Sequence, residues 1–228
     1  MRTVLITLLF TIAVRCYSTT VEETANLRIY YPDYSRIDLV CGETPKGEDK
    51  SVDFCCSAAF TGQLLDTFAH SNIADNHIRG GTLYKGYKCR ANTGMFTWGP
   101  QGWRFAKKAA FPAKAEGLNV GFCQLLVVLN GVEQPIGGGM KGKWNIYRVL
   151  CEKDGRLCIV QSKKVVSFGF FVRCLLALKV TNALYLDMGS GWNYAWYRDV
   201  KGARKEVFPE SKKSYFYTYR TNCITFYK

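Results

Sequence analysis

Hydrophobic and polar residues follow one another along this chain in short segments that predict mostly β-strands. The apolar runs Leu27–Tyr31 and Val52–Phe60 have strand length and are bounded by polar, turn-rich sequence. A longer run, "NVGFCQLLVVLNG", ends at Asn130-Gly131, a strong signal for a tight turn. We therefore expect a short strand at Leu27–Tyr31 and two buried strands in the later runs.

The segment "YRVLCEKDGRLCIV" predicts a β-hairpin. Asp154-Gly155 suits a two-residue turn between the two strands. With that turn, Cys151 lies opposite Cys158 at a separation that a disulfide can span. A disulfide and a pair of buried free cysteines both fit this register.

One segment, "SFGFFVRCLLALKV", predicts an α-helix. Ser167 can cap its first turn. The strand "NALYLD" follows, and it ends at Asp187. Strands, a helix and further strands indicate the α+β class: a single domain with a mixed, largely antiparallel sheet and few helices. The apolar residues at helical spacing are Phe168, Phe171, Leu175 and Leu178.

The first residues have the pattern of a signal peptide. Arg2 precedes a mostly apolar run, Val4–Val14, which is too short to span a bilayer. We expect residues 1–18 to be removed and residues 19–228 to form one secreted, periplasmic or cell-envelope domain, without stable insertion in a membrane. Cys16 raises lipoprotein anchoring, but the preceding Arg15 fits a lipoprotein cleavage site poorly.

The net charge and the cysteine content limit the kinds of ligand and metal site that we expect for this chain. The formal charge of +13 falls to +11 when Arg2 and Arg15 leave with the signal, which favours an anionic ligand. No run of five or six like charges marks a nucleic-acid tail, so nucleic acid is not expected. The ten cysteines include no CxxC pair and there are two histidines, which disfavours a zinc site.

Asp187 is the best single candidate for chemistry. It lies where a strand meets a glycine-rich turn, and Gly189 and Gly191 leave space for a ligand. The alternative is an Asx-type turn, in which the carboxylate caps its own loop. The aromatic residues Trp192 and Tyr194 can line a sugar site, although their spacing, continued by Trp196, also fits the buried face of a strand.

A second polar segment, "HSNIADNHIRGGTLYKGYKC", contains both histidines. His70 and His77 offer acid–base capacity, and Arg79 offers a fork for phosphate. Surface histidines usually have no such role. The glycine-rich "GGGMKGK" is not a phosphate-binding P-loop, because Trp144 follows Lys143 where Ser or Thr is required.

Three stretches resemble the phosphodiester glycosidase domain family, which includes the lysosomal uncovering enzyme and many exported bacterial proteins. "ANTGMFT" is similar to a family segment of the type N-G-G-M/F-F, with Asn92 and Gly94 in register. Arg148 precedes a D-G hairpin as in the family, and "ALYLDMGSG" is similar to the family loop "ALxLDGGxS". The order agrees over roughly Ala91–Tyr197, about half of the mature chain.

The chain also departs from this pattern, which marks it as a divergent branch. Thr93 and Met188 replace glycines, and the turn serine, Ser190, is shifted in register. The resemblance implies a hydrolase that cleaves the bond between a sugar anomeric carbon and a phosphodiester. The ligand would be a glycosyl phosphodiester or another anionic glycan, with no bound metal or cofactor as the expectation and a divalent-cation requirement left open.

The resemblance also implies roles for individual residues. Asp187 and Arg148 would be catalytic, with Asp187 as a catalytic or charge-stabilising carboxylate whose action as base, nucleophile or metal ligand is left open. Cationic neighbours in a basic cleft would keep Asp187 ionised. A second acid is needed for the usual pair of carboxyl groups, and Asp75 is the candidate. The competing function is a non-catalytic glycan-binding envelope protein on the same fold, and a purely structural envelope protein is a third. The expected substrate-binding residues are Asn92, Gly94, Gly189, Ser190, Trp192, Tyr194 and Arg79.

Overall fold

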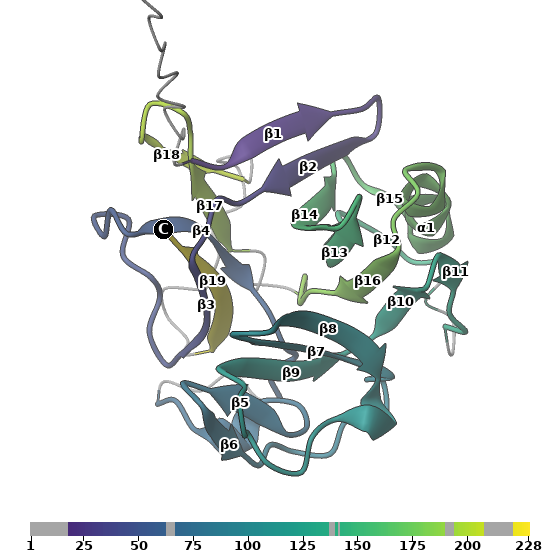
Figure 1. Cartoon of the computed structure of the whole chain (residues 1–228). Helices are drawn as coiled ribbons and strands as arrows, with labels where there is room; N and C mark the ends of the chain where they lie inside the picture. Colours follow the sequence, from purple (N-terminus) through teal and green to yellow (C-terminus); the bar gives the residue numbers. More distant parts are fainter. Residues whose placement is uncertain (1–17, 63–66, 137–139, 141, 190–193, 208–220) are drawn as a thin grey trace, which may run out of the picture.

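Three large sheets and one short strand pair form the fold in the computed structural model (Figure 1). Every strand pairing among the described residues is antiparallel, and α1 (Phe168–Ala177) is the one α-helix among them. This confirms the expected α+β class with few helices. The structure describes residues 18–62, 67–136, 140, 142–189, 194–207 and 221–228.

A seven-stranded sheet packs α1 against one of its faces, as Figure 1 shows on the right. The short pair of β12 (Trp144–Asn145) and β15 (Val166–Ser167) lies beside this helix. In spatial order the seven strands are β1 (Thr20–Glu23), β2 (Leu27–Tyr31), β14 (Arg156–Ser162), β13 (Arg148–Lys153), β16 (Asn182–Tyr185), β10 (Leu126–Leu129) and β11 (Val132–Glu133).

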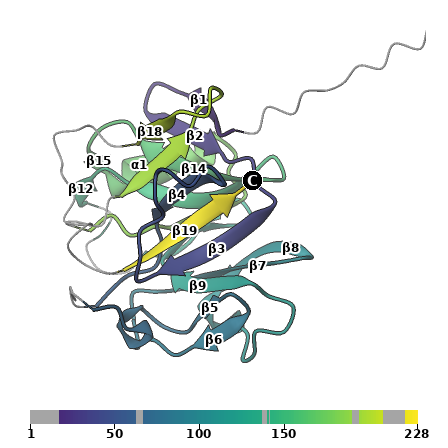
Figure 2. The ribbon, with the colours of Figure 1, turned by 90° about the vertical axis from the view of Figure 1, so that its left-hand side faces the viewer.

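Two five-stranded sheets complete the fold, and β3, β19 and β4 of the first lie side by side (Figure 2). Both sheets share one apolar cluster with the second face of the seven-stranded sheet. The first sheet contains β18 (Arg204–Glu206), β17 (Ala195–Arg198), β4 (Val52–Ser57), β19 (Asn222–Tyr227) and β3 (Arg36–Cys41). The second contains β6 (Thr82–Tyr84), β5 (His77–Arg79), β9 (Val120–Gln124), β7 (Gly94–Gly99) and β8 (Gly102–Lys107). Two 3-10 turns, η1 (His70–Asn72) and η2 (Lys108–Ala110), flank this sheet.

The hairpin and the helix form as the sequence predicts. Asp154 and Gly155 adopt positive φ angles of 51° and 68° in the turn, and Cys151 pairs with Cys158 across the ladder. All cysteines among the described residues are free thiols. Ser167 caps α1 by accepting a hydrogen bond from the Phe170 amide at 3.3 Å.

The long apolar run after residue 118 does not form the single strand that the sequence analysis predicts. It forms two strands, β9 and β10, which belong to different sheets. The side chain of Gln124 accepts a hydrogen bond from the Leu125 amide at 2.8 Å, which replaces a ladder bond where the chain crosses between sheets. Strand β4 is also shorter than predicted and ends at Ser57.

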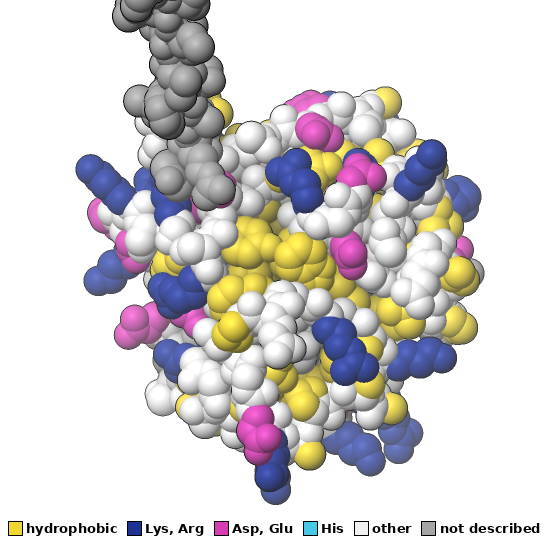
Figure 3. Space-filling view, viewed as in Figure 1, with side chains coloured by type: hydrophobic (Ala, Val, Ile, Leu, Met, Phe, Trp, Pro, Cys, Tyr) yellow, Lys and Arg dark blue, Asp and Glu magenta, His cyan; other side chains and the backbone are white. Residues whose placement is uncertain are grey.

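Charged side chains are scattered over the face shown in Figure 3 rather than gathered in one patch. Most Lys and Arg side chains there lie near the edge of the molecule, some lie further in, and apolar side chains are most visible in the middle. No helix among the described residues has the length and apolar character needed to span a membrane.

Candidate functional site

Asp187 lies where the ends of three sheets meet. Its backbone amide donates a hydrogen bond of 3.0 Å to the carbonyl of Ala58, just beyond β4. The side-chain amide of Gln124, the last residue of β9, donates to the same carbonyl at 3.4 Å. Asp187 itself follows β16. The ends of β4, β9 and β16 therefore converge on this residue, and each belongs to a different sheet.

The carboxyl group of Asp187 is buried, with the residue 5% exposed. Oδ1 accepts a hydrogen bond of 3.0 Å from the Gly189 amide, so the side chain caps its own turn. Burial raises the pKa of this carboxyl to about 7, although backbone hydrogen bonds from Gly189 and Thr61 favour the ionised form. The group is therefore poised to gain or lose a proton near neutral pH.

Arg148 does not supply the cationic neighbour that the sequence analysis expected. Its backbone carbonyl accepts a hydrogen bond of 3.0 Å from the Leu186 amide, next to Asp187. Its guanidinium is fully buried and donates to Gln161 Oε1 at 2.9 and 2.7 Å and to the Tyr194 carbonyl at 3.1 Å. Burial lowers its pKa.

The prediction that cationic neighbours keep Asp187 ionised is therefore wrong, because burial dominates its environment and raises its pKa. The contacts of Arg148 give it a positioning role instead. It ties β13 to the residue that precedes β17.

The side chains of Asn92 and Asp75 are hydrogen bonded to each other, although they come from separate segments of the sequence. The Asn92 side-chain amide donates to Asp75 Oδ2 at 2.9 Å and to the Cys123 carbonyl at 3.3 Å. Lys108 forms an ion pair of 3.1 Å with Asp75 and donates to the Cys89 carbonyl at 2.7 Å. Asp75, Lys108 and Cys123 help to line a cavity of about 440 Å³.

Tyr87 lies close enough to Asp75 and Asp187 for the charge of each carboxyl group to act on its phenol, and the sequence analysis missed it. Burial, the Cys89 thiol and the two carboxyl groups raise the pKa of its phenol to about 12. Its backbone is docked on both sides: the Tyr87 amide donates to the Ile73 carbonyl at 3.0 Å, and the Asp75 amide donates to the Tyr87 carbonyl at 2.7 Å.

The signal for Tyr87 in the sequence is the preceding glycine. A Cβ atom on Gly86 would lie only 1.9 Å from the Ile73 carbonyl oxygen and 2.2 Å from that of Asp75. A side chain there would thus force the Tyr87 segment away from Ile73 and Asp75.

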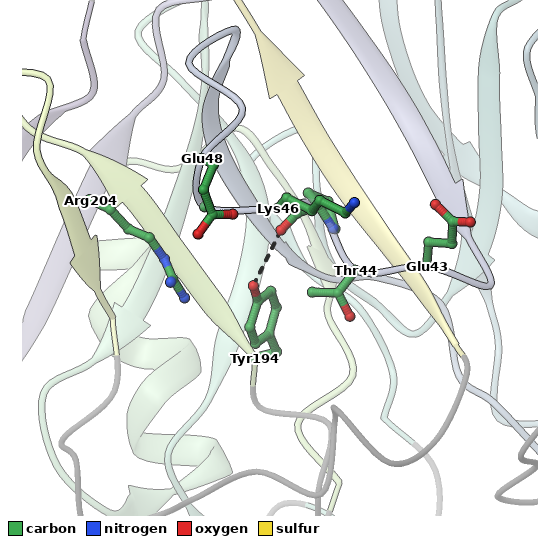
Figure 4. Close-up of a pocket in the computed structure, with 8 residues that line it drawn as sticks. Glu43, Thr44, Lys46, Glu48, Tyr194 and Arg204 are labelled. Carbon is green, nitrogen blue, oxygen red and sulfur yellow. Dashed lines mark hydrogen bonds between the residues drawn. The ribbon is translucent and has the colours of Figure 1, made fainter.

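Tyr194 and Gly94 serve packing in this structure. Tyr194 belongs to a buried cluster with Trp196, and its hydroxyl donates to the Pro45 carbonyl at 3.5 Å. It lines a cavity of about 470 Å³ together with Arg204 and residues 43–48 (Figure 4). Gly94 is buried, and a Cβ atom there would lie 2.6 Å from Leu126 Cβ. Asp187 is in the wall of neither this cavity nor the one beside Asp75.

The histidines form a separate cluster. His70 Nδ1 lies 2.8 Å from His77 Nε2, and the His70 ring stacks on Tyr84 with centroids 3.6 Å apart. Burial lowers the pKa of His77 to about 4. The positive charge of Arg79 lowers the pKa of both histidines. At Cys41 the same charge offsets part of the rise in pKa that burial causes.

Of the three remaining predicted site residues, the structure describes one. Gly189 is exposed and donates its amide to Asp187. Ser190 and Trp192 lie outside the described residues. Within the described part of the chain, no group of three or more His, Cys, Asp or Glu side chains is arranged to hold a metal ion.

Comparison with known proteins gives a likeness in fold. No protein-family model matches the sequence, and no curated protein matches it. The structure is similar to the catalytic domain of zebrafish N-acetylglucosamine-1-phosphodiester alpha-N-acetylglucosaminidase, with a TM-score of 0.57 and 9% identity, over 92% of this chain and 81% of that one. A hypothetical protein from Synechocystis reaches a TM-score of 0.48 with 11% identity, over 92% of this chain and 61% of that one. The first likeness establishes a related fold, that of a phosphodiester glycosidase domain.

Proposed function

We propose that this chain is a hydrolase that cleaves the glycosidic bond of a sugar-1-phosphodiester, with Asp187 as its acid–base group. One observation carries the proposal: a buried carboxyl group with a pKa of about 7 lies at the junction of three sheets. The fold supports the same reaction class, because the zebrafish domain is named as a phosphodiester glycosidase.

Asp187 acts as the general base in this scheme. Its carboxylate takes a proton from water, the water oxygen bonds to the anomeric carbon, and the bond from that carbon to the phosphate oxygen breaks. The bonding electrons leave with a phosphate monoester, whose second pKa is about 6. Such a group departs without a strong proton donor, so one base with a pKa near the working pH is sufficient.

The phosphate must be held by groups other than the Arg148 guanidinium, which is fully buried and hydrogen bonded to Gln161 and Tyr194. Arg148 is a positioning residue, because its contacts fix the strand that runs beside Asp187.

The test compares Asp187→Asn with a matched control, Asp199→Asn. Each carboxylate accepts backbone amides of its own turn, and an asparagine oxygen can do the same. We expect Asp187→Asn to lose about 10²- to 10⁴-fold in turnover of sugar-1-phosphodiesters, assayed with and without divalent ions, with its thermal unfolding still cooperative. Asp199→Asn should keep wild-type turnover.

A glycan-binding protein is the second candidate function. The hydrogen bond from the Gly189 amide favours it, because the turn alone gives Asp187 a structural role. Near wild-type hydrolysis by Asp187→Asn would reject the catalytic assignment, and binding without hydrolysis by the wild type would establish this second function.

Export of the chain belongs to the same proposal. Ser18 and Thr19 are buried, and the Thr19 hydroxyl donates to Asp53 Oδ2 at 2.7 Å. Removal of residues 1–18 preserves the contact between Thr19 and Asp53, whereas cleavage at Val21 removes it. We expect N-terminal sequencing of exported protein to start at Thr19, and a start at Met1 would contradict the removal of a signal peptide.

A further inference from the structure

Asp53 lies at a bulge in strand β4 of the first five-stranded sheet. Phe54 and Val52 have partners on β19, and the register shifts so that Asp53 between them has none. Such a bulge turns a side chain in a direction that a regular strand does not allow. Asp53 is fully buried, and a carboxyl group in that position needs hydrogen-bond donors or a cation close by.

The first described residues of the chain lie against this carboxyl group. The Thr19 hydroxyl donates to Asp53 Oδ2 at 2.7 Å, and the Asp33 amide donates to the same oxygen at 2.9 Å. The backbone amide of Thr19 donates to the Arg198 carbonyl of β17 at 3.2 Å. Thr19 is itself buried, so its nitrogen and its hydroxyl are both held inside the protein.

Two buried side-chain oxygens at this point, Asp53 Oδ1 and Ser18 Oγ, have no hydrogen-bond partner within the described part of the chain. A buried acceptor without a donor costs free energy and is uncommon in native proteins. Burial raises the pKa of Asp53, and the charge of Asp33 adds to this rise. Hydrogen bonds from the Thr19 hydroxyl and the Asp33 amide act against it, as does the charge of Lys228. The uncut chain therefore leaves one oxygen of this carboxyl group without a donor.

We propose that removal of residues 1–18 creates the missing partner, because the new α-ammonium group of Thr19 forms an ion pair with the Asp53 carboxylate. Water adds across the Ser18–Thr19 peptide bond, so that Ser18 leaves as a carboxylate and Thr19 keeps its nitrogen as an ammonium group. This nitrogen is three bonds from the hydroxyl that contacts Asp53, so the two charges lie within about 6 Å of each other. The Arg198 carbonyl accepts one ammonium hydrogen, and two remain for the carboxylate.

The ion pair joins the new N-terminus to the strand that also holds Asp187. An ammonium group buried at this position without a carboxylate would be strongly destabilising. Ala58, the residue just after β4, accepts the hydrogen bond from the Asp187 amide. The mature chain is thus fastened at one end of β4 by a contact that the uncut chain cannot make. This inference rests on the proposed removal of residues 1–18 and not on the proposed hydrolysis.

A double-mutant cycle on the exported protein tests the ion pair. The chain that starts at Thr19 is compared with the same chain acetylated only at its α-amino group, each with and without Asp53→Asn. The acetyl group occupies the place that the Ser18 carbonyl and Cα have in the uncut chain, so it should fit. The asparagine oxygen can still accept the hydrogen bonds to Asp53 Oδ2. Asp38→Asn, which removes another carboxyl group from the same sheet, is the matched control.

We expect acetylation to lower the thermal midpoint by about 3–8 °C in the wild type and in Asp38→Asn, because it removes the positive charge. In Asp53→Asn the loss should be below about 1 °C, since the partner is already absent. No loss in the wild type would overturn the ion pair. Equal losses in the wild type and in Asp53→Asn would overturn it as well, because the effect of the acetyl group would then not depend on the carboxylate.

A second measurement uses the wild type alone and stands even if Asp53→Asn does not fold. Reductive methylation with isotope-labelled formaldehyde marks the α-amino group of Thr19, and NMR titration gives its pKa. We expect this pKa to be higher in the folded protein than in the same protein unfolded in urea. An equal or lower value would overturn the pair. A different N-terminal residue in exported protein would overturn it too, whereas absence of hydrolysis would reject only the hydrolase.

Discussion

Asp187 and Asp199 adopt the same local structure in different surroundings. Each follows a strand, and each carboxylate accepts a backbone amide two residues ahead, from Gly189 or Lys201. Burial raises the pKa of Asp187 to about 7. At Asp199 desolvation is outweighed by hydrogen bonds from Ala203 and Lys201 and by the nearby Lys205, so its pKa is lowered.

The difference shows that the turn does not decide the protonation state of its aspartate. The same capping bond serves a carboxyl group that exchanges its proton near neutral pH in one place and one that is ionised at neutral pH in the other. The convergence of three sheets on Asp187 makes the difference, because it buries the carboxyl group and so disfavours its charged form.

The largest expected effect is on stability as a function of pH. Between its unfolded pKa of 3.8 and its folded pKa of about 7, Asp187 binds more protons in the native state, so stability falls as pH rises. Relative to wild type, Asp187→Asn should gain up to about 4 kcal/mol in unfolding free energy between pH 4 and pH 8.

Urea unfolding of both proteins at each pH measures this gap. Asp199→Asn should behave in the opposite sense: the native carboxylate stabilises above its unfolded pKa, and this contribution is lost as pH falls through its lowered folded pKa. A constant gap between wild type and Asp187→Asn would show that Asp187 has an ordinary pKa.

The next largest effect is the loss of stability on replacing a glycine, and it compares Gly86, beside Tyr87, with Gly202, in the turn of Asp199. Gly86→Ala brings a methyl group against two carbonyl oxygens beside Tyr87 and should destabilise the protein by about 3 kcal/mol. Gly202→Ala, in the Asp199 turn, meets open space and costs only the strain of its positive φ of 73°, about 1 kcal/mol. Denaturant melts of the two variants give the order directly, and equal losses would contradict the docking of the Tyr87 segment.

Much of the fold follows from local sequence. The turn Asp154-Gly155 and the cap Ser167 each act on neighbouring residues, so their elements could be predicted. The run that contains Leu125 looks like one strand because both halves are buried, and its division depends on which sheets lie on either side. A sequence read alone holds no record of that packing.

In the candidate site, too, features set by neighbouring residues could be predicted and features set by distant residues could not. The position of Asp187 at a strand end could be predicted, but its pKa could not, since burial arises from residues as distant as Ala58 and Gln124. Arg148 looked like a ligand-binding cation and is instead fully buried among backbone and amide partners. Tyr87 had no signal of its own beyond the adjacent glycine.

The smallest expected effect on stability is at the exposed ion pair between Lys205 and Asp199. Lys205 Nζ lies 3.5 Å from Asp199 Oδ2, with the lysine side chain 52% exposed. Exposed pairs contribute little, so Lys205→Met should leave the thermal midpoint within experimental error and reduce only its dependence on salt. A clear loss of stability would show that Asp199 is more shielded from solvent than its surroundings indicate.

The central claim is that Asp187 is a catalytic base whose pKa is set by burial. The pH dependence of kcat/KM on a sugar-1-phosphodiester tests it most directly, because this ratio reports ionisations of the free enzyme. We predict a rise through a pKa of about 7 in wild type and in Asp199→Asn. A profile that is flat between pH 5 and pH 9, or one with its rise near pH 4, would contradict the claim.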